Sequence, residues 1–180
     1  MGAVKKDKKR RGRKMKYEEI LPIAQKYKRI LEPYCNKVEI AGSIRRKKEE
    51  CNDIELVIIR KPEKIDELKR VVDEWKRVKG DVRGRYTQRI VPEGLKLDIF
   101  IAADDGSNWG NIFLIRTGSW KFSRYMMGIK AKKEGYEHKG GYLWRRIQGS
   151  GVILKCECYS ESDVFRYLGM EYIPPEERDW

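Results

Sequence analysis

The chain has 180 residues, with 41 Lys and Arg against 28 Asp and Glu and a formal net charge of +13. This length allows one domain, or a compact domain with a smaller companion, and the 40% content of hydrophobic residues excludes a disordered chain. No apolar run approaches about eighteen residues and no signal region is visible, so the sequence indicates neither a membrane partner nor secretion.

The positive charge is concentrated at the N-terminus, where residues 1–16 hold nine Lys or Arg against one Asp. A solvated polycation of this kind favours salt-dependent contacts with phosphates, so Arg10, Arg11 and Arg13 are candidate DNA-binding residues. Two other interpretations of residues 1–15 stay open, a disordered solubilising tail and a nuclear-targeting run. The four cysteines lack zinc-finger spacing, and free thiols indicate a reducing compartment, the cytoplasm.

The first hundred residues predict the order α-β-β-α-β-β, from periodicity and turn signals. The expected elements are helix 17–33, strand 37–41, strand 53–59, helix 63–78, strand 82–91 and strand 95–102. The second helix is expected to end at Gly80, and Pro92-Glu93-Gly94 predicts a hairpin between the last two strands.

A polar cluster at 103–109 marks the predicted boundary between a catalytic palm, residues 16–104, and a C-terminal subdomain, residues 105–180. The elements expected in the second part are helix 108–116, a Thr117-Gly118-Ser119 break, helix 122–135, a hairpin over 141–159 and a helix capped by Ser160. The predicted fold class is α+β: a mixed sheet backed by two helices, plus a small α+β subdomain.

Three carboxylates are the strongest candidates for catalysis. Asp53 and Glu55 lie two residues apart on a predicted strand, so both project from the same face. Asp98 interrupts an apolar run on a strand that we expect beside the first. Gathered carboxylates repel one another unless a divalent cation neutralises them, and Mg²⁺ prefers oxygen ligands completed by substrate phosphates. The pattern predicts a two-ion Mg²⁺ site, with Mn²⁺ as an alternative ion; otherwise each acid simply faces solvent from a half-exposed strand.

A phosphate-binding segment precedes these acids. Gly42 and Ser43 follow a predicted strand, where backbone N–H groups and a hydroxyl can approach an anion closely. Arg45 and Arg46 come next, and a guanidinium group matches phosphate oxygens well. A Gly-Ser pair alone is uninformative, so the prediction depends on its offset from Asp53.

These residues resemble a known family. "GSIRR" followed by "DIE" resembles the signature of the nucleotidyltransferase superfold, and specifically of family X DNA polymerases. The further matching stretches are "LEPYCNKVEIAGSIRR", "KLDIF", "RTGSWKFSRYM" and "SESDVFRYLGMEYIPPEERDW". The resemblance covers residues 17–180 and implies a minimal form with a palm and a C-terminal subdomain only, acting as a monomer.

The resemblance also implies roles for single residues. Asp53, Glu55 and Asp98 would hold two Mg²⁺ ions, and Asp98 would accept the proton of the primer 3′-hydroxyl. The implied contacts to the incoming dNTP come from Gly42, Ser43, Arg46, Asn52, Arg116, Thr117, Gly118 and Trp120. Lys96 and Arg124 would contact DNA, and Thr117-Gly118 would form the tight turn, often with a cis peptide, that lines the sugar.

Five positions depart from the family pattern. Glu55 stands where these polymerases usually carry Asp, and its extra methylene predicts slower or retuned catalysis because Mg²⁺ tolerates distorted geometry poorly. Ile115-Arg116 replaces an aromatic pair, so the resemblance does not carry over the exclusion of ribonucleotides. Ser123 and Met127 replace an Asn and an Arg that contact the base and the template, which bears on fidelity.

The sequence therefore predicts a DNA-directed DNA polymerase that adds dNTPs to a DNA 3′-OH during gap filling or repair. Its expected partners are a dNTP and primer–template or gapped duplex DNA. Two alternatives stay open: a template-independent or non-DNA nucleotidyltransferase, and a DNA-binding module with a decayed active site. We further expect Tyr142, Trp144 and Tyr159 in the core of the C-terminal subdomain, and His138 exposed.

Overall fold

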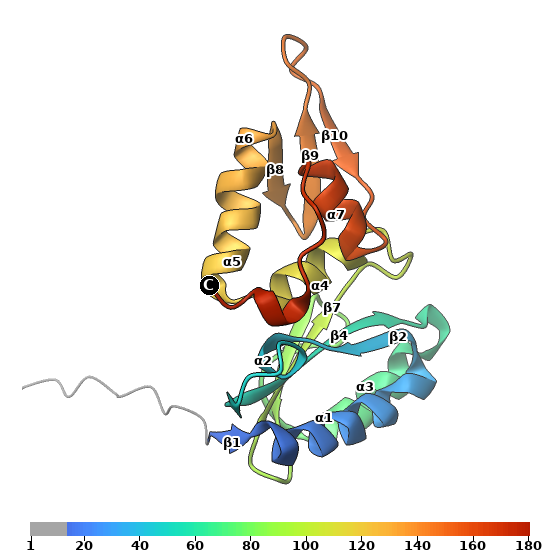
Figure 1. The fold of residues 1–180 in the computed structure, drawn as a ribbon. Coiled ribbons are helices and arrows are strands. Elements are labelled where there is room, and N and C mark those ends of the chain that lie inside the picture. The colour runs from blue at the N-terminus through green and yellow to red at the C-terminus, as the bar shows by residue number, and fades with distance from the viewer. Residues whose placement is uncertain (1–13) are drawn as a thin grey trace, which may run out of the picture.

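The computed structural model describes residues 14–180, which form two stacked units (Figure 1). The first unit, the palm, carries a five-stranded sheet, and the second, the C-terminal subdomain, carries a three-stranded sheet. The palm sheet ends at Ile101, and the first helix of the C-terminal subdomain begins at Trp109. The mixed α+β class expected from the sequence is confirmed.

The palm sheet has the strand order β2-β4-β7-β6-β5. Its strands are β2 (Cys35–Ile40), β4 (Asp53–Arg60), β5 (Lys76–Asp81), β6 (Tyr86–Ile90) and β7 (Lys96–Ile101). Neighbouring strands are antiparallel except for β4 and β7, which run parallel. The two strands that carry the candidate acids are therefore direct neighbours, as predicted.

Two helices cover one face of this sheet, α1 (Tyr17–Leu31) and α3 (Ile65–Asp73) (Figure 1). Both helices bury an apolar stripe against the alternate strand residues that point toward them. The main contributors to this core are Ile20, Ala24, Leu31, Ile54, Leu56, Ile58, Leu68, Val72, Leu97 and Ile99. Because the helices occupy this face, the other strand residues, including all three acids, lie on the opposite face.

Short elements connect the palm strands. They are β1 (Met15–Lys16), η1 (Glu32–Tyr34), α2 (Gly42–Arg45), β3 (Glu50–Cys51) and η2 (Pro62–Lys64). β1 pairs with β3, so two residues close to the predicted tail belong to a small sheet. Gly42 and Ser43, expected in a turn, instead begin the one-turn helix α2.

The second palm helix is shorter than predicted. It ends at Asp73, and residues 76–81 form the edge strand β5 instead of extending the helix to Gly80. Trp75 leaves the helical path and packs its ring edge-on against Tyr27, with ring centroids 5.0 Å apart. Pairing with β6 then decides the conformation of a charged segment whose own pattern favours a helix.

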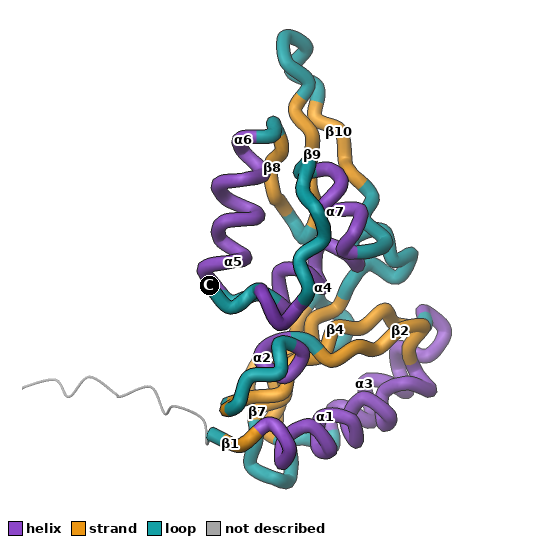
Figure 2. The backbone as a smooth tube through the Cα atoms, in the orientation of Figure 1, coloured by secondary structure: helices purple, strands orange, loops and turns teal. Residues whose placement is uncertain are grey.

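The C-terminal subdomain begins with α4, which lies between the two sheets (Figure 2). Its elements are α4 (Trp109–Thr117), α5 (Trp120–Arg124), the π-helical segment η3 (Tyr125–Lys130), α6 (Ala131–Lys133), β8 (Tyr136–Lys139), β9 (Tyr142–Arg146), β10 (Ile153–Cys156), α7 (Glu161–Tyr167) and η4 (Pro175–Glu177). α5, η3 and α6 make one continuous helix. Trp109 and Phe113 pack on the palm sheet, whereas Leu114 belongs to the core of the C-terminal subdomain, so α4 serves both units.

Several local expectations for this subdomain are met and others are corrected. Ser160 caps α7, accepting a hydrogen bond from the backbone N–H of Asp163. Tyr142, Trp144 and Tyr159 lie outside the apolar clusters, and Tyr159 is 52% exposed, so the expected aromatic core is wrong. Tyr142 and Trp144 lie on β9 on the face away from Leu143, and Tyr159 follows β10, while Phe122, Leu143 and Phe165 fill the core. Within the described part of the chain, no helix has the length and apolar character needed to cross a membrane.

Candidate active site

The candidate acids lie on one face of the palm sheet, opposite the two helices. In the parallel pair, Glu55 lies opposite Asp98, and Asp53 lies opposite Lys96. Residues paired in register point to the same side of a sheet, so the three acids and Lys96 share a face. Among residues 14–180, no Lys or Arg forms an ion pair with any of the three acids, so their charges are not neutralised by a direct partner.

Burial and mutual repulsion both act on these carboxyl groups. Burial raises the pKa of Glu55 to about 8, and the charges of Asp53 and Asp98 add to the rise. The pKa of Asp53 is also raised, first by burial and then by Asp98, and Lys96 opposes this only in part. Such shifts are expected where like charges are held together in a low-dielectric surrounding, and a bound cation would relieve them.

Glu55 takes a position that its length makes possible. Its carboxylate lies over Gly42, where an added Cβ would be 1.7 Å from Oε2. Gly42 has a φ of +63°, a conformation that suits glycine, and it leaves room for the carboxylate. The extra methylene relative to Asp thus carries the charge toward the start of α2.

The acids fit a divalent cation by their chemistry, because Mg²⁺ binds oxygen ligands. Its positive charge would also relieve the repulsion between the carboxylates. As placed, the described residues contain no group of three His, Cys, Asp or Glu side chains close enough to hold one ion. Glu55 must therefore leave Gly42 before all three acids can share ions.

Arg45 and Arg46 lie on the first turn after β2 and reach the C-terminal subdomain. Arg46 donates a hydrogen bond from Nη1 to the Thr117 carbonyl (2.7 Å), and Arg45 donates one to Thr117 Oγ1 (2.7 Å). The Nε of Arg46 forms an ion pair with the Asp179 carboxylate, with Nε and Oδ1 3.3 Å apart. Thr117 is itself buried, and the Thr117-Gly118 peptide is trans, unlike the cis form that the resemblance allowed.

A cavity of about 460 Å³ lies between Arg46 and the helix that begins at Trp120. Its lining residues are Arg46, Glu55, Ile115, Arg116, Gly118, Ser119, Trp120 and Ser123. The structure thus brings together four of the predicted nucleotide contacts, Arg46, Arg116, Gly118 and Trp120, beside one of the acids. Trp120 is 68% exposed, so it is free of the core and available for stacking.

The remaining predicted contacts lie around this cavity. Ser43 is half-buried in α2, and Asn52 is exposed immediately before Asp53. Arg124 is exposed on the helix that begins at Trp120, and Lys96 is half-buried beside Asp53. Arg10, Arg11 and Arg13 lie outside the described residues.

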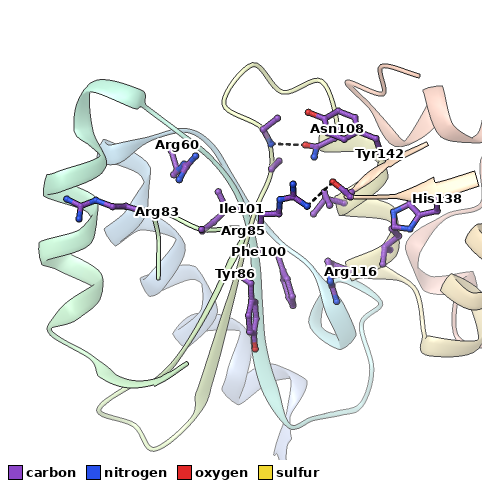
Figure 3. A pocket seen from close by; sticks show the side chains of 17 residues that line it. Arg60, Arg83, Arg85, Tyr86, Phe100, Ile101, Asn108, Arg116, His138 and Tyr142 are labelled. Atoms are coloured by element: carbon purple, nitrogen blue, oxygen red, sulfur yellow. Dashed lines mark hydrogen bonds between the residues drawn. The ribbon is translucent and has the colours of Figure 1, made fainter. Parts of the chain in front are cut away.

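A second, larger cavity of about 650 Å³ lies at the junction of the two units (Figure 3). Arginines from both units line it, Arg60, Arg83, Arg85 and Arg116, together with Tyr142. The guanidinium group of Arg116 stacks on the Phe100 ring at 4.0 Å.

His138 also lines this cavity and is half-buried, whereas we expected it to be exposed. Burial lowers its pKa and favours the neutral imidazole.

Sequence reasoning missed two residues that touch a catalytic candidate. Tyr86 and Gln88, both on β6, donate hydrogen bonds to Oδ1 of Asp98, the latter at 2.8 Å. Alternation along "YTQRI" places both side chains on one face, but only the pairing of β6 with β7 shows that this face carries Asp98.

The fold and this site define a nucleotidyltransferase-type palm joined to a helical and stranded C-terminal subdomain. Residues 112–179 match the family model described as DNA polymerase beta thumb, so we call the C-terminal subdomain the thumb from here on.

A solved structure, the crystal structure of Leishmania infantum polymerase beta in a ternary P/T complex, is similar with a TM-score of 0.73. That likeness covers 94% of this chain and 78% of the other at 19% identity, and it concerns the fold. No curated protein matches the chain. The resemblance to family X DNA polymerases is confirmed in the thumb and in the fold.

Proposed function

We propose that the chain is a DNA-directed DNA polymerase that fills gaps by adding a dNTP to a DNA 3′-OH. The observation that carries this proposal is the placement of Asp53, Glu55 and Asp98 on one sheet face, next to the cavity that holds Arg46 and Trp120. The subdomain that matches the polymerase beta thumb lines the other side of the same cavity. DNA is the acceptor that this combination of parts suits best.

The reaction is a phosphoryl transfer in which the protein positions groups and neutralises charge. The 3′-oxygen forms a bond to the α-phosphorus, the bond from that phosphorus to the bridging oxygen breaks, and pyrophosphate leaves. Asp98 accepts the 3′-hydroxyl proton. Asp53, Glu55 and Asp98 would hold two Mg²⁺ ions, which would supply neutralisation of the charge that develops during the transfer.

The other residues of the cavity bind and orient the nucleotide. Arg46 and Arg116 both line this cavity, and Arg116 has no carboxylate ion-pair partner within residues 14–180, so we assign the triphosphate contacts to these two guanidinium groups. Trp120 stacks on the incoming base, because its exposed ring lies at the rim of the cavity. Lys96 and the basic residues of the N-terminal segment contact DNA phosphates, and Arg124 contacts the template base.

A second candidate function is nucleotide transfer without a template, or transfer of ribonucleotides. It is favoured by Ile115 and Arg116, which line the nucleotide cavity where related polymerases carry an aromatic pair. A third candidate is a DNA-binding module without catalysis. It is favoured by the position of Glu55 over Gly42, which leaves the acids without a three-carboxylate group in the described structure.

One experiment separates the three functions. The protein is incubated with Mg²⁺ or Mn²⁺ and either a one-nucleotide-gapped duplex or a labelled single strand, with each dNTP and NTP supplied separately. Addition of the complementary dNTP at the gap, lost in Asp98→Ala and retained in the exposed control Asp66→Asn, supports the proposal. Extension of the single strand regardless of base favours the second function, and DNA binding without addition favours the third.

A further inference from the structure

The carboxylate of Asp98 is held on one side only. Its Oδ1 accepts hydrogen bonds from the hydroxyl of Tyr86 and from Nε2 of Gln88, the latter at 2.8 Å. Within residues 14–180, no protein group donates a hydrogen bond to its other oxygen, Oδ2. Asp98 is only 7% exposed, and Tyr86 and Gln88 are its side-chain hydrogen-bond donors among residues 14–180.

The register of the sheet places both donors. Gln88 lies opposite Asp98 in the antiparallel pair of β6 and β7, and Tyr86 lies opposite Phe100. All of these side chains therefore project from the face that carries the acids. The donors come from β6, whereas the acids come from β4 and β7, so a third strand contributes to the site.

The ring of Tyr86 has little freedom. It stacks on Phe100 with ring centroids 5.0 Å apart and an interplanar angle of 26°, and Nζ of Lys79 lies 5.2 Å from its centroid. Phe100 is in turn covered by the guanidinium group of Arg116 (Figure 3). Two stacked rings with a cation at each end thus run from the sheet edge to the thumb and limit the positions that the Tyr86 hydroxyl can take.

We propose that Tyr86 and Gln88 are positioning residues, which hold Oδ1 of Asp98 so that Oδ2 alone meets the metal ions and the primer end. A carboxylate fixed by two donors cannot turn without breaking both hydrogen bonds, each of which involves a charged acceptor. Mg²⁺ demands near-octahedral geometry, which a single fixed oxygen satisfies better than a carboxylate free to swing into bidentate contact. This inference rests on the proposed function.

The test uses Tyr86→Phe, which keeps the ring stacked on Phe100 and removes only the hydroxyl. The matched control is Tyr27→Phe, since Tyr27 also donates to a carboxylate, Glu93, at 2.5 Å but belongs to the helix-covered face. Gln88→Met, which keeps the side-chain length and removes the donor, is a second, independent variant. Affinity for Mn²⁺ is measured by electron paramagnetic resonance on protein without DNA or nucleotide, and single-turnover nucleotide addition is measured separately.

We expect Tyr86→Phe and Gln88→Met each to weaken Mn²⁺ binding by about tenfold, the usual effect of losing a group that orients a metal ligand. The rate of the bond-forming step falls by a similar factor, while the Kd of the dNTP stays unchanged. Tyr27→Phe changes neither quantity.

Two results would overturn the inference in distinguishable ways. If the wild type binds Mn²⁺ and adds nucleotides but both variants match Tyr27→Phe, the positioning role is wrong and the proposed function stands. If the wild type neither binds Mn²⁺ nor adds nucleotides to any acceptor, the proposed function fails and the inference fails with it.

Discussion

The carboxylate of Glu161 and the guanidinium group of Arg45 form two hydrogen bonds, of 2.7 and 2.8 Å, across 116 residues of sequence. Arg45 belongs to the palm and Glu161 begins the last helix of the thumb. The same carboxylate accepts a hydrogen bond of 2.5 Å from Arg178, whose side chain is fully buried. One acid therefore joins the palm, the thumb and the C-terminal segment.

Glu161→Gln should destabilise the protein strongly, because it leaves the buried Arg178 and the half-buried Arg45 without their counter-charge. We expect the free energy of unfolding to fall by about 3–5 kcal/mol, the usual cost of breaking a buried ion pair. Urea unfolding measures this change. The control is Asp66→Asn, which removes the exposed partner of Arg83 and should cost at most about 1 kcal/mol. Equal losses in the two variants would contradict the buried role.

The stability that Glu161 contributes should depend on pH. Burial acts to raise its pKa, but hydrogen bonds and charges from Arg45 and Arg178 outweigh burial and hold the pKa below its ordinary value. A folded-state pKa below the unfolded one means that the contribution is complete above the unfolded value and is lost as pH falls through the folded value. Urea unfolding at a series of pH values from about 7 down to 3 checks this. The gap between wild type and Glu161→Gln should narrow toward acid, and a constant gap would refute the assignment.

Gly42→Ala should cost more stability than its backbone conformation alone explains. Gly42 and Gly94 both have positive φ, but an added Cβ at Gly94 meets open space, whereas one at Gly42 meets the Glu55 carboxylate. Gly94→Ala should therefore cost about 1–2 kcal/mol from left-handed strain, and Gly42→Ala clearly more. The free energy of unfolding in urea measures both.

Combining Glu55→Asp with Gly42→Ala tests whether the contact between these two residues causes the loss of stability. The shorter side chain withdraws the carboxylate from the added methyl group, so the double variant should lose only about as much as Gly94→Ala. Simple additivity of the two single changes would show that Gly42 and Glu55 do not interact.

Trp120→Ala should weaken nucleotide binding without affecting the fold. The ring is 68% exposed at the rim of the nucleotide cavity, and stacking on a base contributes about 1–3 kcal/mol. We expect the Kd of the dNTP to rise at least about fivefold in equilibrium titrations, with an unchanged Tm. Trp144→Ala, on the outer face of the thumb hairpin, is the control. A lower Tm in Trp120→Ala would indicate a packing role instead.

Local pattern predicted the elements that frame the site, and long-range pairing determined the rest. The helix over residues 17–31 and the strand that carries Asp53 and Glu55 follow from periodicity, because their apolar spacing agrees with their final environment. The strand over residues 76–81 does not follow from its own sequence, because its charged pattern favours a helix. It is a strand because it pairs with β6. The edge position of β5 could not be read from those residues alone.

The same limit applies within the candidate site. The i, i+2 spacing placed Asp53 and Glu55 on one face, and the apolar flanks of Asp98 favoured a neighbouring strand. No spacing in the sequence links Gln88 to Asp98, or Arg45 to Glu161, because those contacts depend on strand register and on how the thumb meets the palm. The donors of the site were therefore less predictable than its acids.

The π-helical segment Tyr125–Lys130 bears on how this chain can change in length. A π-helical turn accommodates one residue more than the α-helical turn it replaces, and the helix on either side keeps its phase. Met126 and Ala131 both remain buried across the segment. A deletion of one residue here would restore a plain α-helix with both ends still facing the core. The same deletion in α4 would turn everything after it by about 100° and carry Thr117 away from the two arginines that hold it.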